Sequence, residues 1–258
     1  MKLVLNYLSL HLKICLEYKS SFILIMIAQA VYMLIELFAI YSLLIKFDLL
    51  GIYDINQVLL SFSTIWLGYS LSELFGRGFD DFYKIIVNGN FDLLLIRPRN
   101  LFLQIFGTDI CYEKTGRALT SLFIFIYSSI KLIKHFTLLK VLLLFNMILG
   151  CIIVILALFI IGASICFVTI QGLESVNVIT NGTKQVGEYP ISIYPKVVKL
   201  FFTFIIPITI INYYPIDYLI GTTNNILYVF MPLLSIILFI ISKKIFDLGI
   251  RKYCSTGS

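Results

Sequence analysis

Long uncharged stretches of apolar residues alternate along this chain with short segments that carry its charges. A run of about 18 or more apolar residues is long enough to cross the hydrocarbon core of a bilayer as a helix. The pattern predicts a polytopic, all-α membrane protein, with one transmembrane domain over residues 1–258 and six helical spans. The expected spans are residues 22–45, 57–75, 116–134, 141–168, 197–214 and 226–242.

The distribution of basic residues predicts which side of the membrane each segment faces. Cytoplasmic segments of membrane proteins are enriched in lysine and arginine. With both termini in the cytoplasm, four of the 20 lysines and arginines fall outside and the other 16 inside. The four outside are Lys46, Lys131, Lys134 and Lys140. Both termini are therefore expected to be cytoplasmic.

The N-terminal segment, residues 1–21, has a pattern of its own. Leucines recur at helical spacing, at positions 5, 8, 12 and 16, with Lys2, Lys13 and Lys19 on other faces. This pattern predicts a helix that lies in the inner membrane interface, with its basic side toward anionic lipid headgroups. An amphipathic helix packed on protein is the alternative.

Composition argues against several classes of function. The chain is 60% hydrophobic and 13% charged, whereas soluble domains hold about 25% charged residues. Its net charge of +6 comes from basic residues at the ends of apolar runs, so no nucleic-acid partner is expected. Five cysteines without C-x-x-C spacing and two histidines predict no metal site. The chain has no G-x-x-x-x-G-K-S/T phosphate loop, so it is not expected to be the ATP-hydrolysing enzyme.

The longest predicted cytoplasmic loop, residues 76–115, contains the pattern of a short amphipathic helix. Apolar residues recur at three- and four-residue spacing, and charged residues fall on the opposite face: Phe79, Phe82, Tyr83, Ile86 and Val87 against Asp80, Asp81 and Lys84. Asn88-Gly89 is a good C-terminal cap, and Pro98 cannot continue a helix. Such a helix would give another protein something to bind. A plain surface loop on lipid headgroups is the alternative.

Prolines mark two further segments. Pro190 and Pro195 predict a stiff, extended entry into the fifth span. Pro207 predicts a kink within that span, because proline has no N–H to donate and leaves a backbone carbonyl free. Tyr213 and Tyr214, which follow it, are expected in the aromatic belt at the outer interface.

Three phrases carry a resemblance to a known family. N-G-N-F-D-L-L-L-I-R-P-R-N, Y-P-I-S-I-Y-P and F-I-I-P-I-T-I-I-N-Y-Y-P resemble, in order and spacing, type-2 ABC transporter permeases. They are similar above all to the mostly uncharacterised branch with roughly 260 residues and six spans. The resemblance covers nearly the whole chain, and the G-x-F-D-x-L-L-x-R-P phrase from Gly89 to Pro98 is its most specific part.

The resemblance implies an exporter of the bacterial inner membrane. Permeases of this kind work as dimers with an identical or related second permease, driven by a pair of separate cytoplasmic ATPase subunits. ATP and magnesium bind to those subunits, and this chain is expected to bind no cofactor. Apart from the second permease and the ATPases, membrane lipid is the expected partner. Substrate remains open among antimicrobial peptides, lipids, drugs and other amphipathic cargo.

The resemblance also assigns roles to particular segments. The loop between spans two and three would supply the coupling helix that docks on the ATPase, through Phe79, Phe82, Tyr83, Ile86, Gly89, Asp92, Arg97, Pro98 and Arg99. The segment before span five is similar to a second cytoplasmic element, with Tyr189, Pro190, Tyr194 and Pro195. Residues 214–225 would form a short re-entrant piece near the outer face.

Two acidic residues fall within predicted spans. Glu36 lies midway through the first, two turns after Gln29. A carboxylate at the bilayer centre costs about 2.5–3.5 kcal/mol, so it normally faces a partner or a water-filled path. We hypothesise that Gln29, Glu36 and Pro207 line the translocation path or the dimer interface, which would favour a cationic cargo. A purely structural pairing of Glu36, or a position nearer the outer interface, is the alternative. Glu73, four residues before Arg77, is expected to have a structural or interface role.

Other classes of function compete with the permease. A stand-alone secondary transporter often shows inverted repeats, and the two halves of this chain show no symmetry. An intramembrane enzyme would need a Ser-His, Asp-Asp or H-E-x-x-H arrangement within the spans, and the sequence has none. A membrane anchor or assembly factor stays open. Co-purification with an ATPase separates the permease from the secondary transporter and the enzyme, and a transport assay separates it from the anchor.

Overall fold

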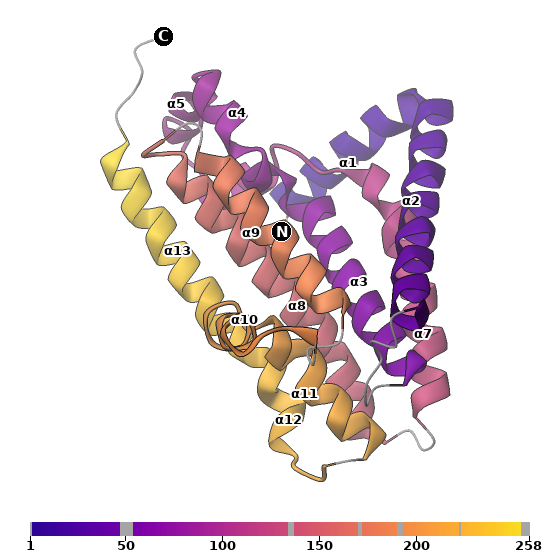
Figure 1. Ribbon diagram of the computed structural model, residues 1–258. Coiled ribbons are helices and arrows are strands. Elements are labelled where there is room, and N and C mark those ends of the chain that lie inside the picture. Colours follow the sequence, from indigo (N-terminus) through magenta and orange to yellow (C-terminus); the bar gives the residue numbers. More distant parts are fainter. Residues whose placement is uncertain are drawn as a thin grey trace.

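The computed structural model describes residues 2–46, 54–133, 137–169, 172–189, 193–221 and 223–253, and these residues form helices with no strand among them. Within them, four helical segments are long and apolar enough to cross a membrane, or five if a bent pair counts as one span. The four are α2 (Lys19–Lys46), α3 with α4 (Ile55–Val87), α8 (Leu138–Ile165) and α12 with α13 (Leu227–Lys252). These long helices stand side by side in Figure 1.

Helix α7 (Thr115–Leu132) corresponds to the third predicted span, and it is too polar to be counted among those four. It packs against α3 and α2. Its three buried serines, Ser121, Ser128 and Ser129, donate to carbonyls of their own helix, while Phe123 and Ile130 are exposed. The polar face of α7 thus points into the bundle and its apolar face points outward, as expected for a helix at the lipid boundary.

The fifth predicted span, residues 197–214, does not form one straight helix. Helix α10 (Lys196–Leu200) and the π-helical turn η3 (Phe201–Ile205) precede Pro207, and α11 (Ile208–Ile220) follows it at an angle of 96°. The predicted kink at Pro207 is confirmed, and it is a sharp break. Pro207 cannot donate an N–H to the preceding turn, so the helix ends before it.

Residues 172–188, which were expected in the cytoplasmic segment before the fifth span, form a helix that packs against the bundle. They form α9 (Gly172–Glu188), which turns back along α8 and contacts α3 (Figure 1). Gly187 makes the close approach possible, because a Cβ there would clash with the side chain of Ile65. Buried Thr180 and Thr183 donate to carbonyls of their own helix. These small and polar residues lower the hydropathy of α9 without preventing its burial.

One end of the bundle carries the short helices α4 (Phe82–Val87), α5 (Asn90–Leu95), α6 (Leu101–Phe106) and η1 (Tyr112–Lys114). Helix α1 (Lys2–Glu17) contacts this end, since His11 Nε2 lies 3.2 Å from the Gly107 carbonyl oxygen and Tyr112 Oη donates to the Leu8 carbonyl at 3.1 Å. One side of α1 is therefore packed on protein, while Leu5 is exposed to the surroundings, as are Leu12 and Leu16.

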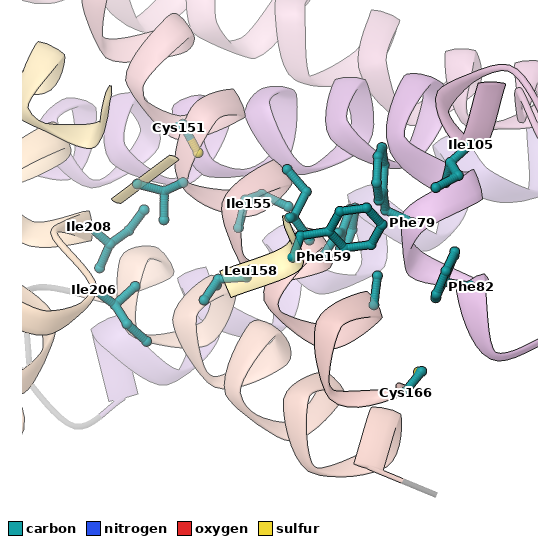
Figure 2. Packing of buried hydrophobic residues seen from close by; sticks show 14 of the residues in the cluster. Phe79, Phe82, Ile105, Cys151, Ile155, Leu158, Phe159, Cys166, Ile206 and Ile208 are labelled. Carbon is teal, nitrogen blue, oxygen red and sulfur yellow. The ribbon is translucent and has the colours of Figure 1, made fainter. Parts of the chain in front are cut away.

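The main core runs along α3 and α8 (Figure 2). Ile155 and Leu158 of α8 lie between Ile206 and Ile208 on one side and Phe79 on the other. At the other end of the molecule, α11 meets α12 (Leu227–Phe230) and η4 (Met231–Leu234), and η4 leads into α13 (Ser235–Lys252). The core therefore joins the break in the chain at Pro207 to the end that bears α4–α6.

Candidate functional site

The segment between α3 and α7 folds into a compact unit, which we call the α4–α6 loop (residues 82–106). Gly89 joins α4 to α5 with a φ of 67°, in the left-handed region that glycine adopts at little cost. The predicted cap and turn at Asn88-Gly89 are therefore confirmed. Gln104 of α6 closes the unit by donating from Nε2 to the carbonyls of Leu94 and Arg99, at 3.2 and 3.1 Å.

The apolar face predicted for this helix is buried in the chain itself. Phe82 is fully buried, and its ring centroid lies 5.5 Å from that of Phe91, 5.2 Å from Phe167 and 5.7 Å from Phe246. Phe79 and Ile86, which were predicted to dock on a partner, are buried as well. These side chains anchor the α4–α6 loop to the end of α8 and to α13.

A different set of residues faces outward. Ile96 is 78% exposed, and its neighbours are open too. We call this surface the exposed tip, formed by Leu93, Leu95, Ile96, Arg97, Pro98 and Arg99. The other predicted coupling residues, Tyr83, Gly89 and Asp92, are half-buried. The structure thus divides the predicted set into buried anchors and an exposed tip with apolar and basic side chains.

Ion pairs tie the same end of α3 to its neighbours. Glu73 pairs with Arg117 of α7, and it also lies 3.3 Å from Lys114 Nζ and 3.7 Å from Arg77. Its expected partner Arg77 is thus one of three. Arg77 in turn contacts Asp80 at 2.7 Å, and Asp81 at 3.0 Å. Lys84 of α4 completes the series by contacting Asp81 at 2.8 Å.

Glu36 has a basic partner from a distant part of the chain. Its Oε1 lies 3.7 Å from Lys184 Nζ on α9, and Lys184 also lies 3.8 Å from Glu188 Oε1. The ammonium group sits 4.2 Å from the centroid of the Trp66 ring. Gln29 is half-buried, two turns away on α2. The carboxylate in the first span is therefore paired, which the structural alternative predicted.

The sequence reasoning missed Lys184, Glu188 and Trp66 as members of this group. Lys184 and Glu188 lie in the segment that was expected in the cytoplasm. Their spacing of four residues places them on one face of a helix. This spacing was the one feature of the sequence that could have indicated a paired Lys184 and Glu188. Its meaning depends on α9 packing against α2 and α3, which hydropathy did not indicate.

A comparison with models of protein families finds one match. The model described as ABC-2 family transporter protein matches residues 30–257. The chain belongs to the ABC-2 transporter family. No curated protein and no solved structure matches it. The resemblance recognised in the sequence is confirmed, and the chain is a multi-pass membrane protein with a permease role.

In this ABC-2 permease the second predicted cytoplasmic element lies away from the α4–α6 loop. Tyr189 packs against the buried cluster that contains Phe62 and Trp66 of α3, and its carbonyl accepts from the hydroxyl of Tyr213. Phe62 lies roughly 25 Å along α3 from Phe79, at 1.5 Å per residue. The structure therefore does not bring Tyr189 to the surface where the loop is exposed.

The remaining residues of that element are placed differently. Tyr194 donates from its hydroxyl to the Gln185 carbonyl at 3.2 Å, and exposed Pro195 precedes the first residue of α10. Pro190 lies outside the described residues. Tyr213, expected in the outer aromatic belt, is buried at 6% exposure.

Pro207 of the permease is buried within the chain at the break before α11. Polar contacts hold α11 to its neighbours there. Asn212 Nδ2 donates to Ser61 Oγ at 3.1 Å, and Ser61 Oγ donates to the Gly187 carbonyl at 2.8 Å. Helices α3, α9 and α11 are therefore linked by hydrogen bonds deep in the bundle.

Among the described residues, no group of three or more His, Cys, Asp or Glu side chains is placed to hold a metal ion. Burial raises the pKa of the Cys111 thiol, which lies just before η1. A thiol in this condition is a poor ligand and nucleophile.

Proposed function

We propose that this chain is the membrane-spanning permease subunit of an ATP-driven exporter. In this proposal it pairs with an identical or related permease, and two separate cytoplasmic ATPase subunits drive the pair. ATP and magnesium bind to those subunits. Family membership supports the permease role, and the candidate spans of the described chain supply the membrane path. The assignment to export rests on family analogy.

The observation that carries the proposal is the construction of the α4–α6 loop. A coupling element must be firmly attached to the spans and must also present a surface to its partner. Phe82 provides the attachment, since it packs on Phe91, Phe167 and Phe246. The exposed tip provides the surface, with apolar side chains beside two arginines. Arginine and large apolar side chains are common in protein–protein hot spots.

The arrangement of the chain ends supports a cytoplasmic position for this loop. Helix α1 contacts α6 and η1, and Tyr253 near the C-terminus packs on Phe91. Both ends of the described chain thus lie at the end of the bundle that bears the α4–α6 loop. The excess of basic residues in the segments expected inside supports a cytoplasmic position for all three.

Affinity purification from the native membrane, followed by mass spectrometry, tests the proposal. We expect an ATPase to co-purify with the wild-type chain, and a second permease if the dimer is mixed. The doubly substituted variant Leu93→Asp, Ile96→Asp should lose the ATPase, because each change puts a charge on an exposed apolar position of the tip. Leu5→Asp is the matched control, since Leu5 of α1 is 57% exposed against 51% for Leu93.

Each outcome has a distinct meaning. Loss of the ATPase from the tip variant alone supports docking through the tip. Retention of the ATPase by that variant contradicts it. If no ATPase accompanies the wild-type chain under conditions that preserve other ATPase complexes, the exporter proposal fails and a secondary transporter becomes the better explanation.

A further inference from the structure

The geometry points to a binding site for an organic cation between α2, α3 and α9, which the ammonium group of Lys184 fills in this conformation. This inference rests on the proposed function and names the class of cargo. We call the site the Lys184 cage, and its walls are Glu36, Trp66, Tyr69 and Glu188. It differs from the hypothesis that Glu36 alone attracts a cation, because the carboxylate already has one.

The cage surrounds the ammonium group with aromatic rings and carboxylates. Lys184 Nζ lies 4.2 Å from the ring centroid of Trp66 and 5.8 Å from that of Tyr69. Glu36 Oε1 and Glu188 Oε1 lie 3.7 and 3.8 Å from the same nitrogen. Cations over the face of tryptophan and tyrosine are attracted by the ring quadrupole, and such cages are a common way to bind quaternary ammonium groups.

The distances indicate what kind of cation the cage suits. Both nitrogen–oxygen distances exceed the ordinary length of a hydrogen bond, about 2.7–3.2 Å. The ammonium is therefore held by charge and by the Trp66 ring rather than by directed N–H bonds. A quaternary or bulky alkylammonium group, which has few or no N–H donors, would lose nothing by taking its place.

The polar groups of the cage are incompletely satisfied by the protein. Glu188 Oε1 and Trp66 Nε1 are buried, and neither makes a hydrogen bond of ordinary geometry within the part of the chain that the structure describes, although the two side chains interact with each other. Two carboxylates also face one lysine, while the nearby Arg117 pairs with Glu73. Buried polar groups are normally bonded. A cationic ligand that carries a hydroxyl group would offer hydrogen-bond partners to Glu188 Oε1 and Trp66 Nε1.

A polar cleft borders the cage at Tyr69, on the side of the bundle that bears α4–α6. It has a volume of about 270 Å³ and lies between α3, α8 and α9, with Tyr69, Glu73, Asn177 and Thr180 in its walls. Tyr69 belongs to both cleft and cage, and Thr180 lies one helical turn before Lys184 on α9. A shift of α9 would therefore withdraw the ammonium group and expose the cage to a cation in the cleft.

Trp66 allows a direct test, because it is the only tryptophan in the chain. Its fluorescence is followed in purified complex during titration with choline chloride, and with the neutral isostere 3,3-dimethylbutan-1-ol at equal ionic strength. Lys184→Met empties the cage, and Lys184→Arg is the matched control that keeps a cation in it. We expect saturable binding of choline to Lys184→Met, with an affinity about tenfold or more above wild type and Lys184→Arg, where the tethered cation competes.

The neutral isostere should give no saturable response. Further substitution of Lys184→Met with Glu36→Gln and Glu188→Gln should abolish the response to choline. Equal responses to choline and to the isostere would show an apolar cavity and overturn the proposal. So would the absence of a choline response in a Lys184→Met complex that keeps its ATPase and its helical circular dichroism.

Lys184→Met leaves buried Glu188 and half-buried Glu36 without their shared cation, which is destabilising. If this variant does not fold alone, the proposal predicts that choline or methylammonium present during purification restores it. Failure of both cations contradicts the cage. If these tests fail while the wild-type complex still contains its ATPase, the cage proposal is contradicted and the proposed function stands. A saturable choline response in a chain that has no ATPase partner would support the cage and contradict the proposed function.

Discussion

Replacing Phe82 by alanine is expected to release the α4–α6 loop from the bundle. Phe82 is fully buried and contacts three other phenylalanine rings at centroid distances of 5.2–5.7 Å. Truncation of such a buried ring costs about 3–5 kcal/mol through lost transfer energy and the cavity that remains. The partners Phe91, Phe167 and Phe246 come from α5, the end of α8 and α13, so the loss falls on the contacts that hold the loop.

Hydrogen–deuterium exchange of the backbone amides in residues 82–95 measures this effect. Since about 1.4 kcal/mol corresponds to a factor of ten, protection should fall by about a hundredfold to several thousandfold if the loop opens locally. Amides of α8 should keep their protection. The control Ile96→Ala changes an exposed side chain, and its effect should stay within about threefold. Wild-type protection in Phe82→Ala would refute the view that this ring anchors the loop.

Three further predictions follow from the packing of α3 and from the position of the chain ends. Gly78→Ala should lower the unfolding temperature in detergent, because the new Cβ would clash with a backbone oxygen of α6. The control Gly182→Ala has nothing within 4 Å of the new Cβ, so it should be neutral or should stabilise the fold by up to about 1 kcal/mol. Equal effects of the two substitutions would contradict the packing of Gly78. Glu73→Met should lower the free energy of unfolding by about 3–5 kcal/mol, because it leaves buried Arg117 without its carboxylate. Arg117→Met should lower it by less, because Lys114 remains 3.3 Å from Glu73. The reverse order would contradict the ion-pair network. Fluorescent-protein fusions at either terminus should be bright and alkaline phosphatase fusions inactive, since both ends are proposed to be cytoplasmic, and the opposite pattern would overturn this orientation.

The sequence predicted the elements whose burial depends on hydropathy alone. Helices α2 (Lys19–Lys46) and α8 (Leu138–Ile165) lie within three residues of the expected spans at each end. Their composition is enough to define them, because lipid or protein can cover an apolar helix equally well. The kink at Pro207 was also predictable, since proline removes a backbone donor whatever surrounds it.

Helix α9 could not be predicted in the same way. Thr180 and Thr183 satisfy their hydroxyls within the helix, and Lys184 finds Glu36 on α2. Hydropathy counts these residues as polar and takes no account of such partners. The same limit applies to the amphipathic spacing around Phe82, which identified a face that must be covered. It could not tell whether this chain or a partner covers it.

Site-specific photo-crosslinking in the native membrane tests the central claim most directly. A photoreactive amino acid, introduced as Ile96→p-benzoylphenylalanine, would sit on the exposed tip, and the matched control Phe123→p-benzoylphenylalanine would sit on α7 at similar exposure, 73% against 78%. The account predicts a light-dependent adduct with an ABC ATPase from position 96 and none from position 123. Equal ATPase adducts from both positions, or none from position 96 while the ATPase still co-purifies, would contradict docking through the α4–α6 loop.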